Sequence, residues 1–193
     1  MTLVKLVDNS RTDKNTLHSY LPLYQKLLES KKYTATNILE VGICDGGSIK
    51  LWSDFFVNAT VHGLDIIDMD EVWDEIKTHP RIVIHASTDA YNPEVVSRLG
   101  VKFDFLLDDG PHTLDSMKKF IQLYSDVMTD DGILIIEDVP SWSWIELLRD
   151  VVPPHLKRFV KAYDLRANKN RYDDIVFTID KGIQPQRLSL QFI

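Results

Sequence analysis

The chain has 193 residues, of which 44% are apolar, and its 22 Lys and Arg against 29 Asp and Glu give a formal charge of -7. This length fits a single domain over 1–193 and suffices for a hydrophobic core without disulfides or a structural metal. The acidic balance provides no basic surface for phosphates and therefore disfavours a nucleic-acid partner.

The single cysteine, Cys44, excludes an internal disulfide framework and has no CxxC or cysteine-histidine pattern near it. A reducing compartment is the simplest explanation for a chain with one unpaired cysteine. No apolar run approaches the ~18 residues that span a bilayer, and residues 1–14 lack the apolar centre of a signal peptide. We therefore expect a cytoplasmic protein with no membrane partner.

Helical and strand patterns alternate along most of the chain. Apolar residues from Tyr20 to Leu28 recur on one helix face and predict a helix over 18–32. This alternation favours right-handed crossovers and a mostly parallel sheet covered on both faces. The predicted strands cover 35–43, 59–66, 81–87, 103–109 and 132–138, and the predicted helices cover 48–56, 70–79, 92–100 and the stretch around Met117, Phe120, Ile121, Tyr124 and Val127.

The C-terminal part has a different pattern. Segments 158–166 and 171–182 have the composition of strands and are joined by the polar turn 167–170, so at least one of them runs antiparallel. The predicted fold class is therefore α/β, a doubly wound, Rossmann-like, mostly parallel sheet of seven strands with an antiparallel C-terminal hairpin strand.

Glycines follow the first predicted strand. Gly42, Gly46 and Gly47 allow the backbone to turn tightly and approach a ligand, and Asp65 ends the next strand about 20 residues later, where an acidic side chain binds ribose hydroxyls. The spacing is not G-x-G-x-x-G, which disfavours a dinucleotide. The alternative is a turn with no ligand; the parallel pattern and Asp65 favour ligand binding.

Two acidic pairs, Asp108-Asp109 and Glu137-Asp138, stand where apolar strands end, and His112 follows the first pair. Carboxylates at adjacent strand ends suit a hard divalent cation, and the imidazole is a candidate base. The metal set expected from this placement is Asp109, Glu137 and Asp138. The alternatives are helix capping, exposure to solvent and, for the histidine, a structural role.

The chain contains several motifs that occur together in one known family. They are TDKNTLHSYLPLY at 12–24, EVGICDGGS at 40–48, GLDI at 63–66, LLDDGPHT at 106–113, IIEDV at 135–139 and RYDDIVF at 171–177. The glycine turn and GLDI resemble the first motif of the class I S-adenosylmethionine-dependent methyltransferases. As a set, the motifs resemble the macrocin- and mycinamicin-type O-methyltransferases of antibiotic pathways, over residues 12–179. Some proteins of that group are named cephalosporin hydroxylases, but no metal triad for non-haem iron is recognisable here.

The resemblance implies roles for individual residues. Glu40 and Gly42 would line the methionine part of S-adenosyl-L-methionine, Asp65 and Ile66 its ribose and adenine, and Ser87 and Thr88 the adenine edge. Segment 1–32 would cover the cofactor, and its residues Thr12, Asp13, Lys14, His18 and Tyr20 would fold over it. A helix N-cap with a solvated lysine explains that segment equally well. Asp108 would be a cofactor-side or structural residue.

The resemblance also implies Mg²⁺ bound by the acids and His112 as the general base, with Asp109 beside it in the catalytic group. Pro111 stands where the family commonly has serine. A metal lowers the pKa of a bound hydroxyl, and an imidazole with an ordinary pKa of about 6.5 accepts its proton. Trp142 is the better candidate for acceptor contact and Trp144 for helix packing. Arg166 and Arg171 flank the last turn. They could face an acidic acceptor, but exposure to solvent is the simpler expectation.

The function expected from these features is a Mg²⁺-assisted O-methyltransferase that acts on a hydroxyl of a small molecule, a sugar or a natural-product scaffold. Two alternatives stay open. One is a methyltransferase with a different acceptor, by N-methylation or at a nucleic-acid terminus. The other is an inactive cofactor-binding module that acts through a protein partner. Because the chain has no added acceptor domain, its pocket is either open or completed by a second subunit in a homo-oligomer.

Overall fold

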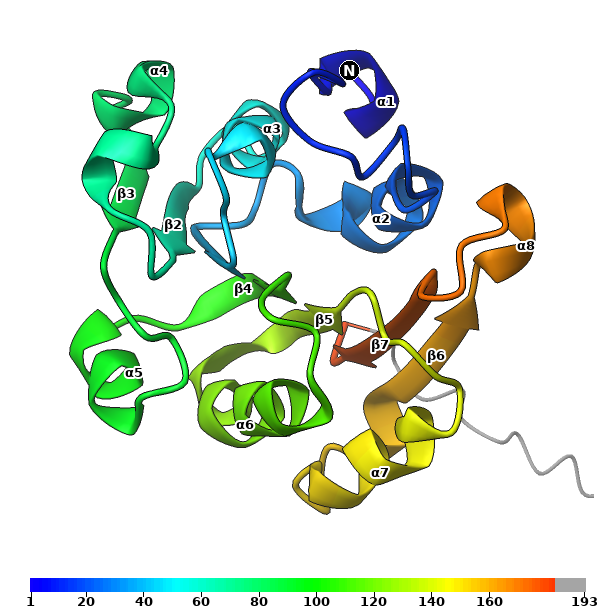
Figure 1. Ribbon diagram of the computed structural model, residues 1–193. Helices are drawn as coiled ribbons and strands as arrows, with labels where there is room; N and C mark the ends of the chain where they lie inside the picture. The colour runs from blue at the N-terminus through cyan, green and yellow to red at the C-terminus, as the bar shows by residue number, and fades with distance from the viewer. Residues whose placement is uncertain (183–193) are drawn as a thin grey trace, which may run out of the picture.

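A seven-stranded sheet with strand order β3-β2-β1-β4-β5-β7-β6 forms the centre of the molecule (Figure 1). The computed structural model describes residues 1–182, so the expected domain end at residue 193 lies outside the described residues. Strands β1 to β5 are parallel, and β7 runs antiparallel to both of its neighbours, which confirms the predicted fold class. The strands are β1 (Asn37–Val41), β2 (Thr60–Leu64), β3 (Ile82–His85), β4 (Phe103–Asp108), β5 (Met128–Ile136), β6 (Val160–Asp164) and β7 (Ile175–Asp180).

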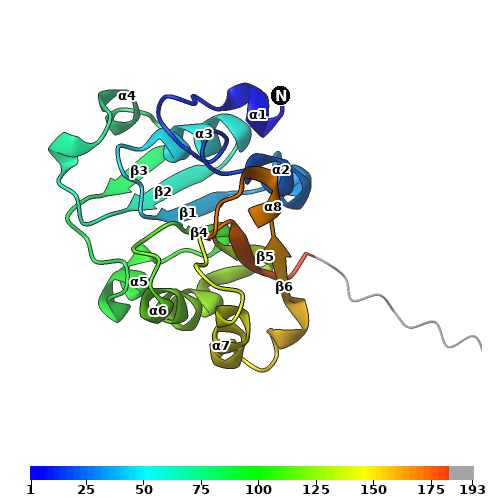
Figure 2. The same ribbon diagram turned by 45° about the vertical axis from the view of Figure 1, so that its right-hand side comes forward.

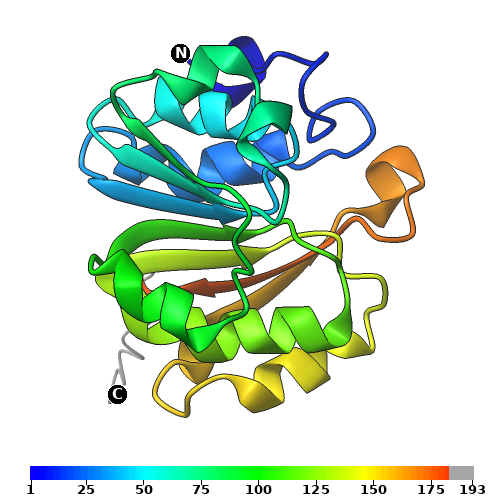
Figure 3. The same cartoon turned by 60° about the vertical axis from the view of Figure 1, so that its left-hand side comes forward.

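Helices cover both faces of the sheet as two separate layers (Figures 1 and 3). Helices α1 to α4 pack on one face and α5 to α7 on the other. Their bounds are α1 (Leu3–Leu6), α2 (Leu21–Leu28), α3 (Gly47–Phe55), α4 (Asp74–Lys77), α5 (Pro93–Leu99), α6 (Leu114–Tyr124), α7 (Trp144–Val151) and α8 (Arg166–Lys169), with 3₁₀ helices at Glu29–Lys31, Met69–Glu71, Ser125–Val127 and Lys157–Phe159.

The central strands supply apolar side chains to both layers. On β4, Phe105 and Leu107 enter the core under α1 to α4, whereas Phe103 and Leu106 enter the core under α5 to α7. All four side chains are fully buried. This two-sided burial explains why the strands are nearly continuous apolar runs in the sequence, and it is the main source of stability.

Two local predictions were wrong. The helix expected over 70–79 is split into a 3₁₀ turn and α4, because Val72 and Trp73 between them are extended and the Trp73 N–H donates to the Asp45 carbonyl at 2.8 Å. The polar turn expected over 167–170 is instead the single helical turn α8 with Asn170 after it.

Helix α8 lies against the N-terminal segment (Figure 2). Lys169 Nζ donates to the carbonyls of Asn15 at 2.5 Å and Thr16 at 2.8 Å, and the Asn168 amide donates to Ser19 Oγ at 3.0 Å. These contacts hold residues 15–19 at the edge of the sheet where β7 begins. Within residues 1–182, no helix is long and apolar enough to cross a bilayer.

Candidate active site

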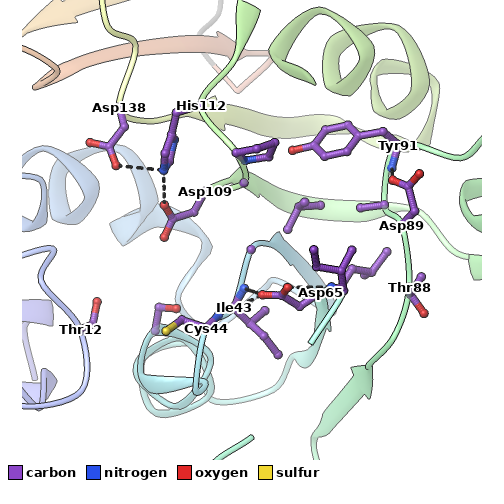
Figure 4. Close-up of a pocket in the computed structure, with 18 of the residues that line it drawn as sticks. Thr12, Ile43, Cys44, Asp65, Thr88, Asp89, Tyr91, Asp109, His112 and Asp138 are labelled. Carbon is purple, nitrogen blue, oxygen red and sulfur yellow. Dashed lines mark hydrogen bonds and ion pairs between the residues drawn. The ribbon is translucent and has the colours of Figure 1, made fainter. Parts of the chain in front are cut away.

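A pocket of about 640 Å³ opens at the carboxyl ends of β1, β2 and β4, where the strand order reverses. Ligands of doubly wound sheets bind at this place, and the volume lies within the roughly 300–1,000 Å³ of small-molecule sites. Figure 4 shows His112, Asp109 and Asp138 together on one side of the pocket and Asp65 with the glycine turn on another. The lining includes Arg11, Thr12, Asp13, Gly42, Ile43, Cys44, Asp65, Ile66, Thr88, Tyr91, Asp109, Pro111, His112 and Asp138.

Gly42 begins the turn after β1 and touches the loop after β4. Its φ is +80°, and a Cβ added there would lie 1.9 Å from the Asp109 carbonyl oxygen. Only glycine combines that backbone conformation with so close an approach. The glycine turn and the acidic loop are therefore in direct contact.

Asp65 fixes the shape of the glycine turn. Its Oδ2 accepts from the N–H groups of Ile43 at 2.8 Å and Cys44 at 3.1 Å, and its Oδ1 accepts from the N–H of Ile66 at 2.7 Å. The side chain also lines the pocket. Asp65 thus connects the end of β2 to the end of β1 and presents a carboxylate to whatever the pocket holds.

Beyond Asp65 the pocket wall continues with one apolar and one polar side chain, Ile66 and Thr88. The Ile66 side chain lines the pocket, and the residue is 75% exposed, so it offers an apolar surface to a flat ring. Thr88 also lines the pocket, and its N–H donates to the Asp65 carbonyl at 2.8 Å. Ser87 does not belong to the lining, because its Oγ donates to Asp68 Oδ1 at 2.6 Å.

Lys14 is buried among carboxylates beneath the pocket, with only 1% of the residue exposed. Its Nζ lies 2.6 Å from Asp109 Oδ2 and 3.6 Å from Glu40 Oε1, and it donates to Glu137 Oε1. Coulombic attraction to these acids outweighs burial and raises the pKa of Lys14 well above its usual value. Lys14 is therefore a permanent internal cation rather than a solvated helix-cap lysine.

Two further acids of the sequence prediction lie behind the pocket lining. Glu40 is fully buried and accepts from Trp52 Nε1 at 2.8 Å, and burial raises its pKa to about 7. Asp108 is 2% exposed and accepts from the Tyr91 hydroxyl at 2.6 Å, and burial likewise raises its pKa to about 7. Both carboxylates therefore accept hydrogen bonds from neighbouring side chains and do not line the pocket.

His112 stands between two carboxylates at the rim of the pocket. Its Nε2 lies 3.7 Å from Asp109 Oδ1 and 3.7 Å from Asp138 Oδ2, and its side chain is 37% exposed. Burial lowers its pKa below the usual 6.5, although Asp138 opposes that shift. The imidazole is therefore neutral near pH 7 and can accept a proton. Burial also raises the pKa of Asp109 to about 7, with Lys14 opposing.

The acids at the ends of β4 and β5 divide into two kinds. Asp109, His112 and Asp138 offer donor atoms within 4.8 Å of one another and could hold a metal ion. Glu137 is outside that group: it is 1% exposed, receives hydrogen bonds from Lys14 and from the Tyr24 hydroxyl, and points into the protein. The expected set of Asp109, Glu137 and Asp138 is thus only partly assembled, because the Glu137 carboxylate is hydrogen-bonded to the buried Lys14.

The remaining predicted residues lie beside the pocket rather than in it. The Tyr20 hydroxyl donates to Asp138 Oδ1, and Lys14 has the position described above.

Sequence reasoning gave no role to Tyr91, Asp173 or Asp174. For Asp173 and Asp174 a signal was available, because RYDDIVF was one of the family motifs. Tyr91 has no such signal, since its contact with Asp108 joins segments that are 17 residues apart.

Known proteins similar to this chain are O-methyltransferases. Mycinamicin VI 2''-O-methyltransferase from Micromonospora griseorubida is 29% identical over 136 residues, which are 66% of this chain and 33% of that protein. Demethylmacrocin O-methyltransferase from Streptomyces fradiae is 26% identical over 136 residues, 67% of this chain and 34% of that protein. The chain therefore spans about a third of the length of these relatives. No protein-family model matches it.

Solved structures share the fold. MycE methyltransferase from the mycinamycin biosynthetic pathway, in complex with Mg, SAH and mycinamycin VI, aligns with a TM-score of 0.71 at 21% identity over 96% of this chain and 57% of that one. Fibrillarin from Aeropyrum pernix with bound S-adenosyl-L-methionine aligns with a TM-score of 0.59 at 18% identity over 77% of this chain and 67% of that one.

The sheet order, the antiparallel β7 and the pocket at the switch point are those of the class I S-adenosylmethionine-dependent methyltransferase fold. By sequence the chain is a distant relative of the macrocin- and mycinamicin-type O-methyltransferases.

Proposed function

We propose that the chain transfers a methyl group from S-adenosylmethionine to a hydroxyl oxygen of a small molecule, with assistance from Mg²⁺. One observation carries this proposal: His112, Asp109 and Asp138 converge on one side of a pocket whose other side is the glycine turn and Asp65. The relatives support the proposal, because their names describe O-methylation, in one case of a rhamnosyl and in another of an olivosyl compound.

The cofactor half of the pocket fits a nucleoside. Asp65 presents a carboxylate for ribose hydroxyls, Ile66 an apolar surface for the adenine ring, and Thr88 a polar group at its edge. Gly42 lets the backbone approach the methionine part. In this proposal Glu40, Asp108, Ser87, Lys14 and Tyr20 position those groups from behind the lining instead of contacting the cofactor.

The donor set on the other side fits a hard divalent cation. Asp109 and Asp138 each offer carboxylate oxygens, and such ions commonly use one or two carboxylates together with water and substrate oxygens. Mg²⁺ bound there would lower the pKa of an acceptor hydroxyl. Glu137 would act indirectly, because it and Lys14 hold the Asp109 carboxylate in place.

His112 is proposed as the general base. The acceptor oxygen forms a bond to the methyl carbon, the electron pair of the broken carbon–sulfur bond stays on sulfur, and the hydroxyl proton goes to His112 Nε2. Asp109 and Asp138, both 3.7 Å from Nε2, stabilise the imidazolium that results. Sugars and natural-product scaffolds carry hydroxyls suited to this chemistry.

Domain organisation and assembly are also proposals. Residues 1–32 are proposed to act as one cofactor-covering segment of a single methyltransferase domain, since Arg11, Thr12 and Asp13 line the pocket. A second subunit that completes the acceptor side, in a homo-oligomer, is compatible with the exposure of Trp142 at 46%.

Two measurements test the function. Titration calorimetry with S-adenosylhomocysteine should show binding, and S-adenosylhomocysteine release should be measured with mycinamicin VI, demethylmacrocin and simple rhamnosides as acceptors. His112→Ala should lower turnover about 10²- to 10⁴-fold while cofactor binding persists, whereas His155→Ala, at an exposed histidine, should change neither. Absence of binding contradicts the proposal. Binding without turnover on any acceptor favours the inactive binding module.

A further inference from the structure

A second group of metal-ligating side chains lies on the other side of Asp138 from His112. It consists of His18, Asp138, Asp173 and Asp174, and one donor atom from each lies within 4.8 Å of the others. These residues come from three separate parts of the chain: the N-terminal segment, the loop after β5 and the loop before β7. Three of them, Asp138, Asp173 and Asp174, bring negative charge to one small volume, and Asp138 is the only member that also belongs to the site described above.

The donor atoms have the spacing of metal ligands. His18 Nδ1 shares a hydrogen bond with Asp174 Oδ1 at 2.6 Å, which a metal ion would replace, and lies 3.2 Å from Asp138 Oδ1. Neighbouring ligands in an octahedral shell with bonds of ~2.1 Å are separated by ~3.0 Å. The Tyr20 hydroxyl also donates to Asp138 Oδ1, as an outer partner of a metal-bound carboxylate would.

One carboxylate of the group has an unused oxygen. Asp173 is 8% exposed, and its Oδ2 pairs with Arg171 at 3.0 Å, but Oδ1 is buried and has no hydrogen-bond partner among the described residues. A buried carboxylate oxygen without a partner costs free energy, so such an atom usually has a ligand.

The charge balance of this second cluster also lacks cations. If ionised, Asp138, Asp173 and Asp174 carry three negative charges, against the one permanent positive charge of Arg171, which pairs with Asp173. One divalent ion would neutralise the remaining two charges.

We propose that His18, Asp138, Asp173 and Asp174 bind a divalent transition-metal ion of the Mn²⁺, Fe²⁺ or Zn²⁺ type. One imidazole nitrogen with three carboxylates suits these ions better than Mg²⁺, which prefers oxygen alone. Asp138 would bridge the two sites, because its Oδ1 faces His18 and its Oδ2 faces His112.

Such an ion would connect the N-terminal segment to the sheet. His18 lies a few residues beyond Arg11, Thr12 and Asp13, which line the pocket. The ion would therefore order the part of the chain that closes over the cofactor half. This role does not depend on methyl transfer, since only Asp138 is shared with the proposed function.

The experiment is a count of bound Mn²⁺ per full-length chain, by equilibrium dialysis and electron paramagnetic resonance. The native chain should bind two ions, and His18→Leu and Asp109→Asn one each. His155→Leu, at an exposed histidine, should still bind two. If the native chain binds one ion and His18→Leu still binds one, the second site is overturned and the proposed function is unaffected. If His18→Leu binds two ions, the second site is likewise overturned.

A second measurement covers the case in which His18→Leu does not fold. In His112→Ala, the Mn²⁺ that remains should still show coupling to a ¹⁴N nucleus, because His18 is then the imidazole ligand available. Absence of that coupling overturns the second site. An ion that is lost in His18→Leu but kept in Asp109→Asn would instead support the second site and contradict the metal of the proposed function.

Discussion

Replacement of Lys14 by methionine tests whether an internal cation holds the acidic site together. Methionine keeps much of the volume of the lysine stem but removes the ammonium, which is 1% exposed and contacts Asp109, Glu137 and Glu40. Removal of one partner from a buried ion pair costs about 3–5 kcal/mol, because the other partner stays buried without compensation. For a chain of this length that corresponds to a fall in Tm of roughly 6–20 °C.

The loss should depend on pH. Without Lys14 the folded-state pKa values of Asp109 and Glu40, already about 7 with the lysine present, rise further above their unfolded values. Groups with a raised folded pKa contribute stability below their unfolded pKa and lose it as pH rises through the folded pKa. The destabilisation by Lys14→Met should therefore be larger at pH 8 than at pH 5.

The assay is urea unfolding at both pH values, in buffer with a chelator so that metal binding does not contribute. Lys119→Met is the matched control, because Lys119 is 52% exposed and pairs with Asp115 on the surface at 3.2 Å; it should cost less than about 0.5 kcal/mol. The double variant Lys14→Met with Glu137→Gln should recover part of the loss. A cost below about 1 kcal/mol at pH 8 for Lys14→Met would refute the charge argument.

Three further outcomes are expected. Gly42→Ala should destabilise the fold by at least about 2 kcal/mol in urea unfolding, since its Cβ would meet the Asp109 carbonyl; Gly100→Ala, which also has a positive φ but whose Cβ would meet only the Arg98 carbonyl at 3.8 Å, should cost less. Asp65→Ala should weaken S-adenosylhomocysteine binding at least about tenfold by calorimetry, and unchanged affinity would contradict its role. Burial lowers the pKa of His62 to about 4, so the folded protein loses stability as pH falls from about 6.5 to 4. In urea titrations over this range His62→Phe should lose about 1–2 kcal/mol less stability than the native chain, a figure reduced for solvent screening.

The sequence predicted the sheet because its strands are buried on both faces. Runs such as 133–136 are apolar at every position, and their alternation with helical segments leaves few topologies. Helix 70–79 failed because a tertiary contact prevailed: the Trp73 N–H bonds to the glycine turn, and its ring stacks under Arg11 at 4.6 Å. Local periodicity carries no information about such contacts.

The sequence indicated which residue types form the candidate site but not which side chains contact one another there. The sequence shows that Glu137 and Asp138 are adjacent, yet only the fold shows that one faces Lys14 and Tyr24 while the other faces His112. Lys14 could not be distinguished from a surface lysine, because the acids around it lie 26 to 123 residues away. Long-range charge pairing was the missing information.

The contact between Gly42 and the Asp109 carbonyl has a consequence for how new acceptors could be accommodated. The donor side and the acceptor side of the pocket meet there backbone to backbone, with no side chain between them to adjust. Reacting atoms must be aligned to fractions of an ångström, and this junction fixes that alignment in the main chain. Changes of acceptor are therefore expected to arise in the outlying loops that carry Trp142 and Tyr172, which are 46% and 68% exposed, while the junction stays the same.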